Sequence, residues 1–307
     1  MQRSNLGLLT FSWLGLAACS DPDPVPACRT GSECATGICT AQGRCAVLPV
    51  DAGDMSDVDA GLGDGGEVDG DGGAPIGCTP NHDGVLLSVE IPRRAGLSAN
   101  FRAATGASVS LVGTGTGTDR HWDLSGMLAN DRDLVLATTP VEGAWYASEF
   151  PEATYVARLS ITEELLGVFS STDTELLLLG VVSRDGGAVR TELHYDPPVT
   201  LLKFPFQEGD TWSTDSTVSG VALGFITTYL ESYTQRVEGR GTLATPYGEF
   251  PVVRILTLLE RSIPVAAIIR QAGFFAECFG AVATVVSENF ETEDEFEQAA
   301  EVRRLAR

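Results

Sequence analysis

Between Cys78 and Arg307 the chain consists of short apolar runs separated by Gly, Pro and Asp. The runs are rich in Val, Leu, Thr and aromatic residues, which fit a pleated and half-buried strand. Short runs that end at turn-forming residues are typical of β-strands rather than helices. The pattern therefore predicts a mainly β, antiparallel domain over residues 78–307.

Strands are expected wherever such a run is bounded by turn residues. These runs lie at residues 85–91, 107–112, 121–124, 134–138, 144–148, 155–159, 165–169, 175–182, 188–195, 201–204, 233–244, 250–259, 265–270 and 281–287. Pro197-Pro198 is expected to interrupt the series, because proline cannot donate to a strand ladder. Thr245-Pro246-Tyr247-Gly248 carries Pro and Gly at the positions that a type I turn prefers, so it predicts a hairpin. Gly239 and Gly241 predict a bulge or tight curvature in its first arm.

One helix is expected, at residues 293–305. Thr292 and Glu295 have the spacing of a capping box, and acidic residues crowd the first turn. Arg303, Arg304 and Arg307 lie at the C-terminal end, where the helix dipole favours cations. The sequence therefore predicts that the domain ends in a helix.

Two further stretches resemble a known class of domain. Residues 205–212 read P-F-x-x-G-D-T-W, and residues 241–254 read G-x-x-x-T-P-x-G-x-F-x-x-x-R. This order resembles uncharacterised exported β-rich domains of bacterial lipoproteins, which are similar to the open half-barrels of lipoprotein and lipid carriers. The resemblance implies a strongly curved sheet, arranged as a sandwich or an open half-barrel. Its residues are turn formers and aromatics, so it implies no catalytic residue.

The N-terminus carries an export signal. Arg3 precedes an apolar stretch at residues 6–16, and Leu16-Ala17-Ala18-Cys19 resembles the lipobox of bacterial lipoproteins. The resemblance implies that residues 1–18 are a signal peptide and that Cys19 is acylated, palmitate included, so that acyl chains hold the protein on a lipid bilayer. Ser20 favours the outer membrane, with the protein facing the periplasm or the cell surface. The apolar stretch is too short to span a bilayer as a helix, and no transmembrane helix is expected.

After a tether at residues 19–27, four cysteines lie within residues 28–45. They are Cys28, Cys34, Cys39 and Cys45. A segment this small cannot bury a core, so the spacing predicts a knot with two disulfides, whose connectivity stays open. A zinc site is the alternative, but zinc ligands usually follow Cys-x2-Cys spacing. The segment is similar to short cysteine-rich repeats of bacterial surface lipoproteins and distantly to Dickkopf-type or EGF-like knots.

Residues 46–77 alternate acidic residues with glycine. Because glycine maximises chain entropy and like charges repel, this composition predicts a disordered linker. Asp69-Gly70-Asp71-Gly72-Gly73 superficially resembles a calcium loop, but the bidentate Glu that closes an EF-hand loop is missing.

Two cysteines remain in the β domain. If Cys19 is acylated and the four knot cysteines pair with one another, Cys78 and Cys278 are left over. We expect them to form a disulfide worth about 4 kcal/mol in the chain-entropy model. The alternative is two buried thiols.

The net charge and the sequence motifs restrict the classes of partner and cofactor that we expect. The formal net charge is −22, which excludes a polyanion such as nucleic acid as partner and disfavours anionic lipid headgroups. The chain carries no P-loop, no Gly-x-Ser-x-Gly and no His-Glu-x-x-His, so no cofactor or metal is expected.

The one polar patch that could carry chemistry is Asp119, His121 and Asp123. Alternation along a strand would place all three on one face. A solvated strand face is the favoured explanation for them, and no catalytic residue is assigned.

These features predict a membrane-anchored exported lipoprotein with a non-catalytic binding or structural role. The first alternative is a carrier that encloses a lipid or another apolar small molecule. The second is a hydrolase that uses carboxylates and histidine. The expected partners are the bilayer, through acylated Cys19, and a protein or an apolar ligand.

Overall fold

The computed structural model describes residues 78–262 and 266–307. The predicted signal peptide, tether, cysteine knot and linker lie outside the described residues. Among the described residues, no helix has the length and apolar character needed to cross a bilayer.

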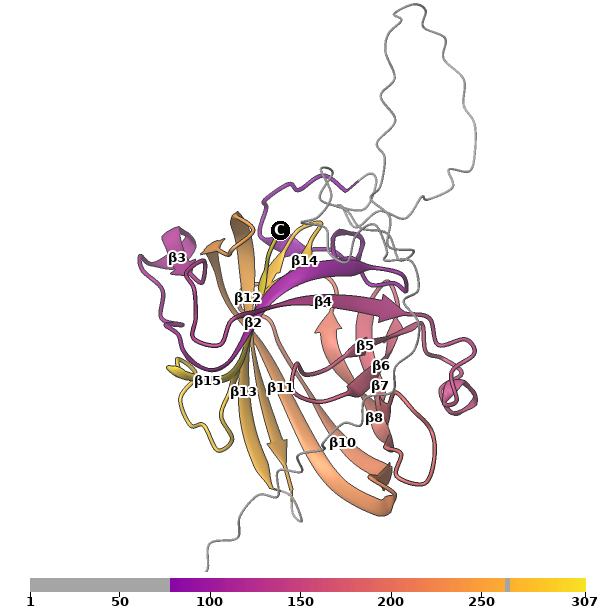
Figure 1. Ribbon diagram of the computed structural model, residues 1–307. Helices are drawn as coiled ribbons and strands as arrows, with labels where there is room; N and C mark the ends of the chain where they lie inside the picture. Colours follow the sequence, from indigo (N-terminus) through magenta and orange to yellow (C-terminus); the bar gives the residue numbers. More distant parts are fainter. Residues whose placement is uncertain (1–77, 263–265) are drawn as a thin grey trace, which may run out of the picture. The chain divides into compact units, whose positions relative to one another are not determined.

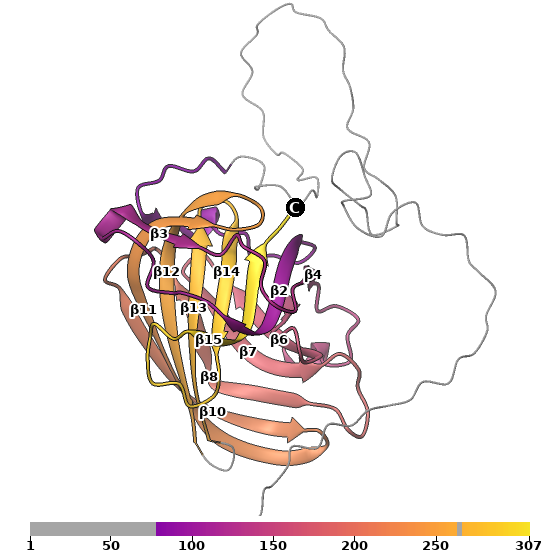
Figure 2. The same ribbon diagram turned by 60° about the vertical axis from the view of Figure 1, so that its left-hand side comes forward.

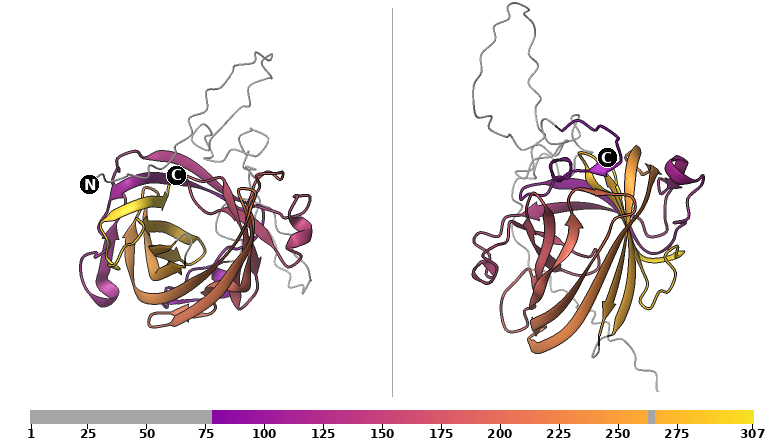
Figure 3. Two further views of the ribbon diagram at one scale, coloured as in Figure 1. Left: turned by 90° about the horizontal axis from the view of Figure 1, so that it is seen from below. Right: turned by 180° about the vertical axis from the view of Figure 1, so that it is seen from behind.

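The described residues fold into an antiparallel barrel (Figure 1). Its twelve strands are β2 (Ser98–Ser108), β4 (Arg132–Thr139), β5 (Tyr155–Arg158), β6 (Leu165–Ser171), β7 (Glu175–Ser183), β8 (Glu192–Lys203), β10 (Thr211–Ala222), β11 (Phe225–Ala244), β12 (Glu249–Arg261), β13 (Ala267–Ala276), β14 (Gly280–Ser287) and β15 (Gln298–Leu305). Each strand pairs with the next of these along the chain. Seen from one end, the strands form a ring (Figure 3, left).

The barrel closes where its first and last strands meet. β15 pairs with β2 from Gln298 opposite Ser108 to Leu305 opposite Phe101, and Figure 2 shows the yellow β15 beside the indigo β2. The expectation of a sandwich or an open half-barrel is therefore wrong. Closure gives both terminal strands a partner and removes the free edges that an open sheet would expose.

The expected C-terminal helix is also wrong, because β15 occupies most of its range. Ala299 and Val302 are fully buried, and the strand pairs on both sides, with β14 and with β2. Burial and two ladders of hydrogen bonds outweigh the local preference for helix.

Several strand limits differ from the expectation. β8 runs through Pro197 and Pro198, because the two prolines fall in a bulge where β7 pairs with His194 and Val199 but not with the residues between. Residues 144–148 form no strand and lead into the 3-10 helix η4 (Ala147–Glu149). The expected bulge in β11 is confirmed between Val237 and Gly239.

The two ends of the barrel are built differently. One end, the strap end, is crossed by the strap, which we define as residues 78–92 and which includes β1 (Val85–Leu86) and η2 (Ser88–Glu90). β1 pairs with β9 (Phe206–Gln207), and the predicted disulfide between Cys78 and Cys278 is present, with 5.7 Å between the two Cα atoms. The other end, the tip end, carries the β7–β8 and β10–β11 hairpin turns, at the bottom of Figure 1.

A second covering lies on the outer face. The flap, residues 109–131, contains η3 (Gly117–Asp119) and β3 (Arg120–Asp123), and β3 pairs in parallel with β11. Trp122 of the flap is buried against Phe274 of the barrel wall. The flap and the barrel wall together enclose the largest apolar cluster of the described residues.

Candidate functional site

A row of side chains on β11 points into the barrel. Glu231, Tyr233, Gln235 and Val237 are buried, whereas the residues between them are more exposed. Because successive side chains of a strand alternate between its two faces, this row lines the lumen. The buried face of this strand thus carries three polar side chains.

Glu231 is the centre of the row. Its side chain is fully buried, and one carboxylate oxygen accepts a hydrogen bond of 2.6 Å from Arg261 Nε. The other oxygen accepts a hydrogen bond of 2.8 Å from the Tyr233 hydroxyl. Both carboxylate oxygens of Glu231 are thus held in place by side chains of β11 and β12.

Two more tyrosines join this network. The rings of Tyr195 and Tyr233 lie 6.5 Å apart, and the Arg261 guanidinium lies 5.0 Å from the centre of the Tyr229 ring. Burial, and secondarily nearby phenol and carboxylate groups, raise the pKa of Tyr195 and of Tyr233 well above the ordinary value. Both phenols therefore stay neutral and able to donate hydrogen bonds.

The lumen also contains buried polar atoms that the protein does not satisfy. Gln235 is 1% exposed and Ser216 is 2% exposed. Neither the amide nitrogen nor the amide oxygen of Gln235 has a hydrogen-bond partner among the described residues, and the same holds for Ser216 Oγ. Because an unsatisfied buried group costs about 1–3 kcal/mol, these positions favour an occupant that can hydrogen-bond.

Apolar side chains complete the lining. Tyr155, Phe169 and Leu178, from β5, β6 and β7, pack in one cluster with Tyr195 and Tyr233. The lumen therefore offers an ion pair and unsatisfied amide and hydroxyl groups beside an aromatic and aliphatic wall. This combination fits a molecule with an apolar body and a polar group.

Access differs between the two ends. At the strap end, Leu86 and Ile91 of the strap pack with Phe206 and Val237 and fill the interior. Toward the tip end, Tyr229 and Leu259 are only half-buried, and the Arg261 side chain is 27% exposed. The lining residues nearest the tip end are therefore partly exposed to solvent.

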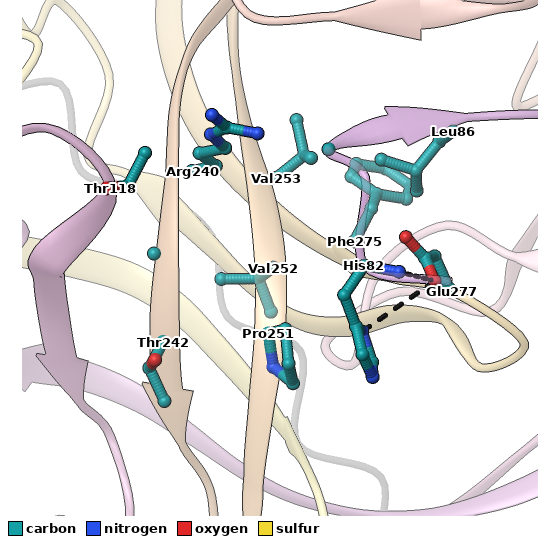
Figure 4. Close-up of a pocket in the computed structure, with 12 residues that line it drawn as sticks. His82, Leu86, Thr118, Arg240, Thr242, Pro251, Val252, Val253, Phe275 and Glu277 are labelled. Atoms are coloured by element: carbon teal, nitrogen blue, oxygen red, sulfur yellow. Dashed lines mark hydrogen bonds and ion pairs between the residues drawn. The ribbon is translucent and has the colours of Figure 1, made fainter. Parts of the chain in front are cut away.

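A second candidate is a pocket of about 390 Å³ beside the strap, where Arg240, Val253 and Phe275 of β11, β12 and β13 lie near Leu86 (Figure 4). His82, Arg240 and Glu277 are its charged or titratable residues. Glu277 accepts hydrogen bonds from the backbone N–H groups of Asn81 and His82, at 2.7 and 2.9 Å. Arg240 donates to the Asp83 carbonyl at 3.1 Å. These groups mainly hold the strap in place, so the pocket is a weaker candidate than the lumen.

The predicted polar patch lies on the flap. Asp119 ends η3, and His121 and Asp123 lie on β3. His121 Nε2 lies 3.5 Å from Glu249 Oε1 at the surface. Asp123 accepts hydrogen bonds from the Ser125 hydroxyl and backbone N–H, which lower the pKa of its carboxyl group.

The three histidines do not converge. His82 pairs with Glu277, His121 with Glu249 and His194 with Glu192. Glu149, Glu192 and His194 could place one ligand atom each within 4.8 Å of one another. However, Glu192 is already paired with Arg190 at 2.9 Å, and His194 stacks on Phe150. This arrangement is a satisfied surface cluster.

The sequence analysis did not identify the inward-facing row of β11 as a candidate site, although its alternating pattern is visible in the sequence. From Tyr229 to Val237 every second residue is Tyr, Glu, Tyr, Gln or Val. Alternation marks these residues as one face, but their polarity does not reveal that this face is the inner one. The pairing of Glu231 with Arg261 depends on the register between β11 and β12.

Comparisons with known proteins add little. No family model matches the sequence, and no curated protein matches it. A solved structure from Bacteroides fragilis NCTC 9343, described as a protein proposed to be exported and as having a YmcC-like fold, is similar at 12% sequence identity. The match covers 73% of this chain and 98% of that chain, with a TM-score of 0.34. A likeness this distant supports no argument about function.

Proposed function

We propose that this protein is an exported, lipid-anchored and non-catalytic binding protein whose barrel lumen holds an amphipathic ligand. The observation that carries the proposal is the pair of buried, unsatisfied side chains, Gln235 and Ser216, on the inner face of the barrel. The ligand's polar group would hydrogen-bond with these side chains, and its apolar body would lie against the aromatic wall.

The number of strands supports a ligand in the lumen. An eight-stranded barrel is just wide enough for its own side chains to fill, and the diameter grows with the number of strands. Twelve strands make a wider barrel than eight, and this width supports the proposal of a ligand in the lumen. At the strap end Leu86 and Ile91 take up part of that room, whereas the tip end has no such insertion among the described residues.

Export and anchoring rest on the sequence and on one structural feature. The proposed acylation of Cys19 and the outer-membrane location follow from the lipobox-like sequence. The disulfide between Cys78 and Cys278 supports a compartment outside the reducing cytosol.

Native mass spectrometry of the full-length protein, extracted in mild detergent from the membranes of a bacterial host, tests the proposal. The protein mass reports whether Cys19 carries acyl chains, and a dissociable mass difference reports a bound ligand. We expect a dissociable amphiphile that Gln235→Leu releases. The exposed Gln207 provides the matched control, because Gln207→Leu makes the same chemical change outside the lumen.

Each outcome bears on a separate part of the proposal. A ligand that is present in the wild type and in Gln207→Leu but depleted in Gln235→Leu supports the lumen site. A ligand retained equally in all three proteins, or no ligand in any of them, contradicts it. An unmodified Cys19 contradicts the anchor alone.

A further inference from the structure

The β10–β11 hairpin ends in exposed apolar side chains. Leu223 is 70% exposed, Phe225 77%, Ile226 91% and Leu230 59%. We call Leu223, Phe225 and Ile226 the tip. Val189, from the neighbouring β7–β8 hairpin, is 76% exposed, and the Gly224 N–H donates to the carbonyl of the adjacent Arg190. Apolar side chains of two hairpins therefore gather at the same end of the barrel.

The sequence of the β10–β11 hairpin end itself carries no charge. Residues 218–230 contain no Asp, Glu, Lys or Arg, although such residues make up 20% of the chain. Charged side chains normally keep exposed hairpins soluble and unpaired. Their absence over a whole hairpin end indicates a surface that water does not cover in the working state of the protein.

The two strands of the hairpin pair with each other up to the turn. β10 and β11 pair without interruption from Thr211 opposite Arg236 to Ala222 opposite Phe225. In the turn itself, the Leu223 N–H donates to Thr191 Oγ1 at 3.2 Å. A segment that enters the apolar part of a bilayer must have its N–H and C=O groups paired within the protein, and the groups in the β10–β11 ladder meet that condition.

The turn residue is not one that local geometry prefers. Leu223 has φ of 51° and Gly224 has φ of 84°. A two-residue turn with both angles positive favours Asn or Asp followed by Gly, and a leucine there is strained. Leucine is therefore better explained by what its side chain contacts outside the hairpin than by the stability of the turn.

We propose that the tip docks on a zwitterionic lipid bilayer and inserts into the interfacial region. Lipid fits the tip better than an aqueous partner, because an uncharged hairpin end can enter a bilayer without desolvating charge. The net charge of −22 disfavours anionic headgroups. Docking places the tip end, where the lining residues are partly exposed to solvent, against the membrane.

An anchor at Cys19 is compatible with this orientation. Outside the predicted knot, residues 19–27 and 46–77 lie between the anchor and Cys78, and a chain of about 40 residues can span up to about 140 Å when extended. The anchor therefore does not dictate which end of the barrel faces the bilayer, and the tip supplies the contact that does.

Fluorescence quenching in vesicles tests the inference on the full-length protein. Phe225→Trp places a tryptophan at the tip. Tyr247→Trp places one at the strap end, in the turn between β11 and β12, where Tyr247 is 40% exposed. Both proteins are reconstituted into phosphatidylcholine vesicles with brominated acyl chains, which quench tryptophan only at short range. The native tryptophans contribute the same background to both.

We expect bromolipid to quench Phe225→Trp severalfold more than Tyr247→Trp, with the tip within about 5–10 Å of the acyl boundary. Adding Ile226→Asp to Phe225→Trp should abolish the difference, because a carboxylate opposes insertion. Equal quenching of the two single variants would overturn the inference. So would a blue-shifted emission of Phe225→Trp without vesicles that disappears on dilution, because it would assign the tip to a second copy of the chain. Neither result depends on whether the lumen holds a ligand.

Discussion

The outer face and the lumen of this barrel both bury polar groups, but they treat them differently. Beneath the flap and at its edge, Arg254 bonds to Glu238, Glu295 and the Leu111 carbonyl. Arg304 bonds to Asp131 and to the Leu124 and Gly126 carbonyls. Both guanidinium groups are fully buried, and each leaves only Nε without a partner.

In the lumen, by contrast, the whole side-chain amide of Gln235 has no partner in the part of the chain that the structure describes. The two arginines tie the flap and the segment before β15 to the barrel wall, so their bonds belong to the fold. The amide of Gln235 contributes nothing comparable to the fold. The comparison supports the proposal that the amide of Gln235 serves binding, whereas the bonds of Arg254 and Arg304 serve stability.

The largest effect is expected from breaking the outer clamp, by which we mean the bonds that Arg254 and Arg304 make to the flap. Arg304→Met should lower the free energy of unfolding by about 4 kcal/mol, because it leaves Asp131, 7% exposed, as a buried charge without its cation. Urea unfolding measures this change. Arg102→Met is the control, because it removes a cation from an exposed pair with Asp133 and should cost less than about 1 kcal/mol. Equal losses in the two variants would show that the clamp is no stronger than a surface pair.

An intermediate effect is expected from alkali, through the phenols of the lumen. Burial raises the pKa of Tyr155 to about 12, and the pKa values of Tyr195 and Tyr233 are also raised. A raised pKa means that the unfolded chain loses the proton first. The stabilisation is therefore complete below about pH 10 and disappears as the pH rises through the folded pKa.

Tyr155→Phe isolates one of these groups. Between pH 10 and 12 the wild type should lose about 2 kcal/mol more stability than this variant, which has no phenol to ionise at that position. Unfolding curves at several alkaline pH values measure the difference. Parallel losses in the two proteins would mean that the Tyr155 hydroxyl is accessible to water in the folded state.

A smaller effect of opposite sign is expected at the tip. Leu223→Asn should raise the free energy of unfolding by about 1 kcal/mol, because Asn tolerates the left-handed backbone that strains Leu223. Thermal unfolding of the vesicle-free protein measures it. A loss of stability instead would show that the Leu223 side chain supports the hairpin itself.

Much of the barrel can be predicted from local pattern. The run at residues 175–182 falls within β7, and Gly239 marks the bulge in β11. Closure could not be predicted, because it depends on β15, and the stretch from Thr292 to Arg307 that contains this strand carries the local features of a helix. With residues 293–305 taken as a helix, β2 has no partner on one side and the sheet has to remain open.

The lumen was hidden for the same reason. Only closure makes one face of β11 an interior, and only the register with β12 brings Arg261 to Glu231. The disulfide, by contrast, follows from cysteine counting, because it needs no knowledge of strand order. Closure and the lumen could not be predicted, because they depend on long-range strand pairing and not on local propensity.

The most direct test of the account is the stability of Gln235→Leu in ligand-free protein, measured by urea unfolding beside the wild type. Leucine is similar in size and needs no hydrogen bonds. If the lumen is a binding site, we expect the free energy of unfolding to stay the same or to rise by about 1 kcal/mol, because an unsatisfied buried amide is removed. A loss of about 2 kcal/mol or more would mean that the amide has a structural partner, and the lumen would then be part of the fold rather than a binding site.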